Sequence, residues 1–94
     1  MIIKVFEYTG SFAEDKDAAK ELREECLIPT LNNSSDEVIL DFQEVQSSTQ
    51  SFIHALISKI LQEQGEAILS RIRYINCADK IKGLIIMVTN YSLE

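Results

Sequence analysis

Residues 38–57 have the sequence Val-Ile-Leu-Asp-Phe-Gln-Glu-Val-Gln-Ser-Ser-Thr-Gln-Ser-Phe-Ile-His-Ala-Leu-Ile. Its first part, Val38 to Phe42, is a short apolar run with charged flanks, typical of a strand that is buried on both faces. From Phe52 onward, apolar residues recur in pairs every four positions, which predicts an amphipathic helix. These residues are Phe52, Ile53, Leu56, Ile57, Ile60 and Leu61. The stretch therefore predicts a strand, a polar turn over 46–51 and a helix.

The segments on the N-terminal side continue this alternation. Residues 2–8 are rich in β-branched and aromatic side chains and predict a strand that is closed by a turn at 9–11. From about Ala13 the apolar spacing becomes helical, and Pro29 is expected to stop that helix. A cluster of turn-forming residues, 32–35, then leads into the strand at 38–42.

The segments on the C-terminal side are a strand and a helix. Gly65 is expected to end the second helix through a left-handed cap, and 68–75 alternates as a strand does. After Asn76 the apolar spacing favours a third helix with Asp79 in its first turn, although 84–89 alone would also fit a strand.

An alternation of strands and helices over 94 residues predicts one α/β domain, spanning 1–94, with a small, mostly parallel or mixed sheet and helices packed against it. The final Leu93-Glu94 resembles a tag remnant and receives no functional weight. In open α/β sheets, sites lie beyond the carboxyl ends of the strands, which is where we expect 46–51.

The charge balance disfavours some classes of partner. The net charge of −6 repels phosphate backbones, so no nucleic acid is expected as a partner, and the basic clusters 16/20/23, 71/73 and 80/82 are expected to be solvated faces. We expect no membrane segment and a cytoplasmic location, since no apolar run approaches the roughly 20 residues of a span. Two widely spaced cysteines, Cys26 and Cys77, predict reduced, partly buried thiols rather than a disulfide.

The candidate site is the start of the second helix. Backbone N–H groups and the hydroxyls of Ser47, Ser48, Thr49 and Ser51 would gather there at the positive end of the helix dipole, which favours an anion or a phosphoryl group. The competing interpretation is helix capping, since Ser47 and Gln50 have the spacing of a capping box.

Other chemistry has weaker support in the sequence. His54, the only histidine, lies three residues after Ser51, but no carboxylate partner is evident, so an exposed or helix-packing histidine is the favoured interpretation. The scattered Cys26, His54 and Cys77 have no metal-ligand spacing. No cofactor is predicted, because the three glycines form no phosphate-binding or dinucleotide pattern.

Taken as a whole, the pattern Val-Ile-Leu-Asp-Phe-x-x-Val-x-Ser-x-x-x-Ser-Phe resembles the STAS-like domain family of unknown function, whose members are distantly similar to anti-anti-sigma factor (STAS) domains. The resemblance spans nearly the whole chain. It is carried by Gly10 before a helix with Leu22-Arg23, by Leu40-Asp41-Phe42, by Gln50-Ser51-Phe52, and by 71–76 before the last helix.

The resemblance implies a regulatory role. In STAS regulators, the second serine of an Asp-Ser-Ser-Gly-like motif is phosphorylated by an anti-sigma-type serine kinase. That serine corresponds to Ser51, while Thr49 stands at the motif's Asp and Phe52 at its Gly. These two differences from the motif affect the expectation of phosphorylation more than the expectation of the fold.

The main hypothesis is therefore a non-enzymatic, cytosolic protein-interaction module. It would act with a GHKL-type (histidine-kinase-type) ATPase or an anti-sigma-like protein, with Ser51 as phosphoacceptor. Partner contacts would come from the residues around it: Ser47, Ser48, Thr49, Gln50, His54 and Asp41. The alternative is a nucleotide- or anion-binding domain that uses the same turn, and hydrolase chemistry by Ser51 and His54 is the least favoured hypothesis. If strand 2–8 lies at a sheet edge, it would also allow a homodimer.

Overall fold

The computed structural model describes residues 1–94 and contains one three-stranded parallel sheet. Its strands are β1 (Ile2–Lys4), β3 (Val38–Asp41) and β5 (Ile72–Ile75), arranged side by side in that order with β3 in the centre. In the register, Ile3 lies beside Leu40, which lies beside Tyr74. A separate two-residue parallel pair joins β2 (Phe12–Ala13) to β4 (Ser47–Ser48).

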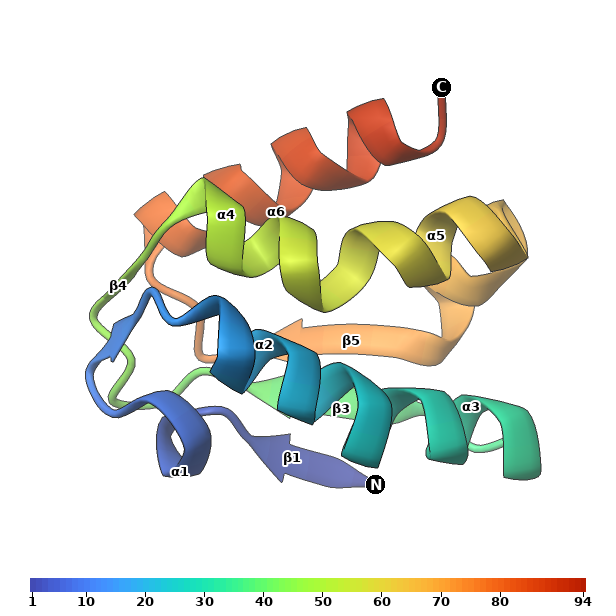
Figure 1. The fold of residues 1–94 in the computed structure, drawn as a ribbon, viewed down its shortest axis with the longest axis horizontal. Coiled ribbons are helices and arrows are strands. Elements are labelled where there is room, and N and C mark those ends of the chain that lie inside the picture. The colour runs from blue at the N-terminus through green and yellow to red at the C-terminus, as the bar shows by residue number, and fades with distance from the viewer.

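Helical segments form the second layer, and the larger ones lie on one side of the sheet (Figure 1). They are α1 (Phe6–Thr9), α2 (Lys16–Leu22), the π-helical turn η1 (Arg23–Leu27), α3 (Ile28–Asn33), α4 (Gln50–Ile53), the π-helical turn η2 (His54–Ser58), α5 (Lys59–Gln64), the 3₁₀ helix η3 (Glu66–Arg71) and α6 (Asp79–Ser92). Because sheet neighbours are also consecutive in the chain, right-handed crossovers place both connections on the same face. The domain is thus a two-layer α/β fold, and the predicted fold class is confirmed.

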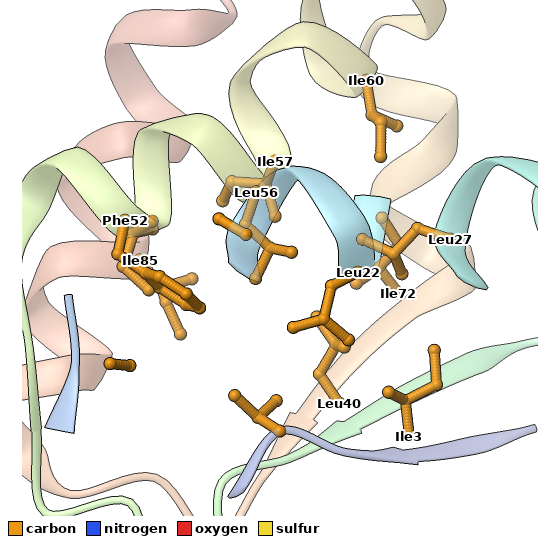
Figure 2. Close-up of a cluster of buried hydrophobic side chains, with 14 of the residues drawn as sticks. Ile3, Leu22, Leu27, Leu40, Phe52, Leu56, Ile57, Ile60, Ile72 and Ile85 are labelled. Atoms are coloured by element: carbon orange, nitrogen blue, oxygen red, sulfur yellow. The ribbon is translucent and has the colours of Figure 1, made fainter. Parts of the chain in front are cut away.

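The core lies between these two layers. Side chains from the helices, such as Leu22, Phe52 and Leu56, point toward Leu40 and Ile72 of the sheet (Figure 2). All six residues of the predicted stripe from Phe52 to Leu61 are buried, as are both phenylalanines of the 38–57 stretch. Burial of this apolar stripe, at about 25 cal/mol per Å², is what holds the second helix on the sheet.

The outer face of the sheet is not covered by helices (Figure 1). Ile2 is 59% exposed, Arg73 is exposed, and Ile39 on the central strand is half-buried. The prediction that 38–42 is buried on both faces is therefore correct for its core side and for Asp41, whereas Ile39 on the outer face is only half-buried.

Both edge strands are shorter than their patterns predict, since the central strand limits them. At the start of β3, Val38 pairs with Ile72 of β5. At its end, Asp41 pairs with Lys4 of β1 on one side and with Ile75 of β5 on the other. Beyond those points no neighbouring strand exists. The expected strand 2–8 instead turns into α1 after the Val5 N–H donates to the Asp41 carbonyl at 2.9 Å, and residues before Ile72 form η3.

The prediction that Pro29 stops the first helix is wrong. The chain stays helical from Lys16 to Asn33, and η1 ends two residues before the proline. In a regular α-helix the proline ring would clash with the carbonyl four residues earlier. The wide turn, in which the Ile28 N–H donates to the Arg23 carbonyl five residues back, lets the helix pass the proline.

Two arginines that were expected on solvated faces are structural. Arg71 donates to the carbonyls of Leu31 at 3.0 Å, of Ser34 and of Asp36 at 3.2 Å, so it ties the end of α3 to the start of β5. Arg23 of η1 donates to the Ala55 carbonyl of η2 at 2.7 Å and joins the two π-helical turns. Gly65 ends α5 as predicted, but with φ 71° and ψ −163° it lies outside the left-handed helical region, so the prediction of a left-handed cap is wrong. The prediction that the last segment is a helix is confirmed by α6.

Candidate functional site

The turn that follows β3 has two parts. Residues after Asp41 first form a tight loop in which the Val45 N–H donates to the Phe42 carbonyl at 3.0 Å. Ser47 and Ser48 then form β4 against β2, and the helix begins only after Thr49. The hydroxyl-rich segment is therefore a short strand held by the N-terminal part of the chain, and not a free loop.

Two hydroxyls of this segment form hydrogen bonds to the backbone of the domain. The Ser48 hydroxyl donates to the Ala13 carbonyl at 2.8 Å, which fastens β4 to β2. The Thr49 side chain accepts a hydrogen bond from the Phe52 N–H at 3.1 Å, so Thr49 is the N-cap of the helix. The predicted capping role is correct in kind but belongs to Thr49 instead of Ser47. A threonine thus does at this position what an aspartate would also do, since both are good N-caps.

Ser51 carries the one fully exposed hydroxyl of this segment, whereas Ser47 is half-buried. Ser51 is the second helical residue, and its side chain makes no hydrogen bond within the domain. The helix behind it runs without a break from Gln50 to Gln64, so its dipole is positive at Ser51. Added negative charge on Ser51 would lie where that dipole stabilises it.

Phe52 points away from this surface. Its side chain is fully buried in the core (Figure 2). The ring therefore does not project toward a molecule that approaches Ser51, although it stands where STAS regulators carry a glycine.

His54 packs against the last helix. Its ring stacks on Tyr91 of α6, with 5.9 Å between ring centroids and 21° between planes. It makes no hydrogen bond to Ser51 or to a carboxylate, so nothing orients it as a general base. The favoured interpretation of an exposed, helix-packing histidine is confirmed.

Asp41 does not join the hydroxyl cluster. Its Oδ1 accepts hydrogen bonds from the Asn76 side chain and from the Gln43 N–H, each at 2.9 Å. The Asn76 amide, then the Gln43 N–H, and to a smaller extent the charge of Lys4 hold the pKa of Asp41 below its ordinary value, against the opposing effect of burial. The carboxylate stabilises the loops that follow β3 and β5.

Asp41 instead borders a polar cavity of about 360 Å³ at the carboxyl ends of β1 and β3, formed with Lys4, Phe6, Glu7, Gln43 and Glu44. Neither this cavity nor the hydrogen bond from Asn76 beside it is predicted by the sequence pattern. Asn76 and Glu44 have positive φ angles of 55° and 69°. An asparagine directly after a strand was the available signal for Asn76, because asparagine tolerates the left-handed region.

The structure contains no cluster of three or more His, Cys, Asp or Glu side chains that could hold a metal ion. Cys26 and Cys77 are both free and half-buried. The Cys26 thiol lies 3.2 Å from the Tyr8 hydroxyl, and this hydrogen bond is the main reason that the pKa of Tyr8 rises to about 12. Burial raises the pKa of Cys77. None of the helices combines the length and the apolar character that crossing a membrane requires.

Of the comparisons with known proteins, the one with protein families gives a match. Neither a curated protein nor a solved structure matches the chain significantly. Residues 18–82 match the family described as "STAS-like domain of unknown function". This range is more than half of the chain and contains most of α2, as well as β3, the hydroxyl-bearing segment, the second helix and β5. The chain therefore belongs to the STAS-like domain family of unknown function.

Proposed function

We propose that this domain is a regulatory protein-interaction module that docks a partner protein through residues 46–54. The exposed side chains of this segment are Gln46, Gln50, Ser51 and His54. The observation that carries the proposal is the exposure of Ser51 at the helix start, beside two neighbours whose hydroxyls are committed to structure. In this proposal the partner supplies all catalytic machinery, and the module itself is not an enzyme.

The proposed partner is a GHKL-type ATPase of the anti-sigma class, acting as a serine kinase. In the phosphoryl transfer, the Ser51 oxygen forms a bond to the γ-phosphorus of ATP, the bond to the β,γ-bridging oxygen breaks, and ADP leaves. The hydroxyl proton goes to a base of the partner. Phosphoserine carries a charge of about −1.5 to −2, which the helix dipole stabilises at this position.

The regulatory effect would be a change in docking. The new charge lies within the proposed contact surface, on a domain that already has a net charge of −6. Phosphorylation therefore makes the surface less compatible with an acidic partner face and more compatible with an arginine-bearing one.

The test is incubation of the domain with ATP and a GHKL-type ATPase of the anti-sigma class, followed by intact-mass measurement and pull-down. We expect one added phosphoryl group on the wild type and none on Ser51→Ala. Ser47→Ala is the matched control, because Ser47 lies in the same segment but belongs to β4; this variant should be phosphorylated normally.

Two results would contradict the proposal. One is a wild-type domain that acquires no phosphoryl group, combined with a Ser51→Ala variant that binds the ATPase as the wild type does. The other is a phosphoryl group that disappears in Ser47→Ala and persists in Ser51→Ala.

A nucleotide or anion bound without covalent change at the same helix start is the alternative. Thermal shift of the isolated domain with ATP, ADP and inorganic phosphate separates the two. A ligand at about 100 times its dissociation constant adds about 2.7 kcal/mol, so saturable stabilisation without any partner would favour the alternative.

A further inference from the structure

The outer edge of β5 has no partner strand. β5 pairs only with β3, and the Phe42 N–H donates to the Ile75 carbonyl at 3.0 Å, so the backbone groups of Ile75 face β3. Backbone groups alternate sides along a strand, and those of Tyr74 therefore point outward. The N–H and C=O of Tyr74 form no hydrogen bond within the domain, and such an edge is a template for another strand.

An apolar groove runs along this free edge, between β5 and α6. It has a volume of about 340 Å³, and its lining includes Leu69, Ile72, Tyr74, Ile85 and Ile86. Ile86 is 56% exposed and Leu69 is 40% exposed. An unpaired strand edge beside exposed apolar side chains is typical of a surface that binds another polypeptide.

We propose that the occupant of this groove is a second copy of the domain, with the two β5 edges paired in antiparallel fashion. α6 runs back over the sheet in the direction opposite to β5 (Figure 1). A two-fold axis through the β5 edge would therefore set the two α6 helices side by side and cover Ile86 of each copy. The contact is self-complementary, as a two-fold dimer requires.

The distribution of charge favours a second copy at this edge over the opposite one. Two molecules with a net charge of −6 associate most readily where carboxylates are absent. The only charged residue that lines the β5–α6 groove is Lys82. In contrast, the two cavities beside β1 are both lined by Glu7, and one of them also by Asp41 and Glu44.

The positions on α6 also avoid a clash between like charges. If the two helices cross at Ile86, Lys82 lies four residues before the crossing point and Asn90 four residues after it. Lys82 of each copy would then lie opposite Asn90 of the other, and the two ammonium groups stay apart. Both residues line the groove in the monomer.

Sedimentation equilibrium from micromolar to millimolar concentration tests the proposal on the full chain. We expect the average mass to rise from 10.7 kDa toward twice that value as concentration increases. Ile86→Glu should weaken the dimer by at least about tenfold, because it places a carboxylate in the groove. The matched control is Ile2→Glu on β1, where the wild-type side chain is 59% exposed; it should leave the dimer unchanged.

A second measurement locates the contact. Hydrogen exchange of the Tyr74 amide should slow as the protein is concentrated, since that N–H becomes bonded only in the dimer. The proposal is overturned if the mass stays at that of one chain, if Ile2→Glu dissociates the dimer and Ile86→Glu does not, or if the mass doubles while exchange at Tyr74 is unaffected. Thermal melts of both variants confirm that they fold.

Discussion

Substitution of Asn76 by glycine should destabilise the domain at neutral pH and much less in acid. The change removes the amide that donates to Asp41 at 2.9 Å and leaves the Gln43 N–H as the carboxylate's other donor. A hydrogen bond to a charged acceptor is worth about 2 kcal/mol. Glycine also relieves the positive φ of 55°, which returns about 1 kcal/mol. The net loss at pH 7 is therefore about 1 kcal/mol, or about 4–8 °C in Tm.

The pH dependence separates the two contributions. The folded-state pKa of Asp41 is depressed, so its stabilising effect is present above the unfolded pKa of about 3.9 and is lost as pH falls through the folded value. Asn76→Gly moves the pKa of Asp41 up toward its ordinary value. The difference in unfolding free energy between wild type and variant should therefore shrink below about pH 4.

Urea unfolding at neutral and acid pH measures this difference. Glu44→Gly is the matched control, since Glu44 has a φ of 69° but makes no hydrogen bond to Asp41. That variant should gain about 1 kcal/mol at both pH values. An equal loss in Asn76→Gly at both pH values would refute a role for the Asn76–Asp41 hydrogen bond, because Asn76 would then act through its backbone alone.

Three further predictions concern the helices. Thr49→Ala should cost about 1 kcal/mol through loss of the N-cap, while Thr49→Asp should keep the cap; chemical denaturation of both variants checks this, and equal stability of Thr49→Ala and wild type would contradict it. Arg71→Met should cost about 2 kcal/mol, because the carbonyls at the end of α3 lose their donor, and faster hydrogen exchange in residues 28–33 should accompany the loss. Phe52→Ala should cost about 3–5 kcal/mol by leaving a cavity in the core; a loss below about 1 kcal/mol in thermal or urea unfolding would mean that the ring is not buried as described.

The sequence predicted those elements whose apolar residues mark a buried face within one short segment. The apolar run at 38–42 and the stripe from Phe52 to Leu61 identified the central strand and the second helix. The lengths of the edge strands could not be found this way. Whether Tyr8 or Ile68 continues a strand depends on where β3 begins and ends, and that neighbour is far away in the chain.

In the candidate site, too, features within one segment were predictable and contacts between distant segments were not. A hydroxyl near a helix start is visible in sequence, and Ser51 was identified from the family pattern. The hydrogen bond from the Ser48 hydroxyl to the Ala13 carbonyl was not predictable, because it requires β2 to pair with β4, and the two residues are 35 positions apart. The cavity beside Asp41 was missed for the same reason, since Lys4, Glu7 and Glu44 come from separate segments.

One signal was present in the sequence but was not recognised. The apolar residues Phe52, Leu56 and Ile60 are spaced by four. In an α-helix of 3.6 residues per turn, a strict spacing of four drifts by about 40° at each step. All three are nevertheless buried on the same side, because η2 widens the helix within this stretch.

The two wide turns have a consequence for the lengths of these helices. Each one accommodates a residue that a regular α-helix would not need, and Arg23 and Ala55 link the two turns across the interface. Deletion of one residue from either turn would let that helix become regular and would leave the residues beyond it near their present orientation, because the five residues of the wide turn rotate about as far as four residues of an α-helix. In the second helix Ile60 would then stay in the core, whereas in the first helix the proline ring of Pro29 would meet the carbonyl four residues earlier. Single-residue deletions in 54–58 should therefore be better tolerated than those in 23–27, and sequence alignments of related domains should place gaps in the former segment more often than in the latter.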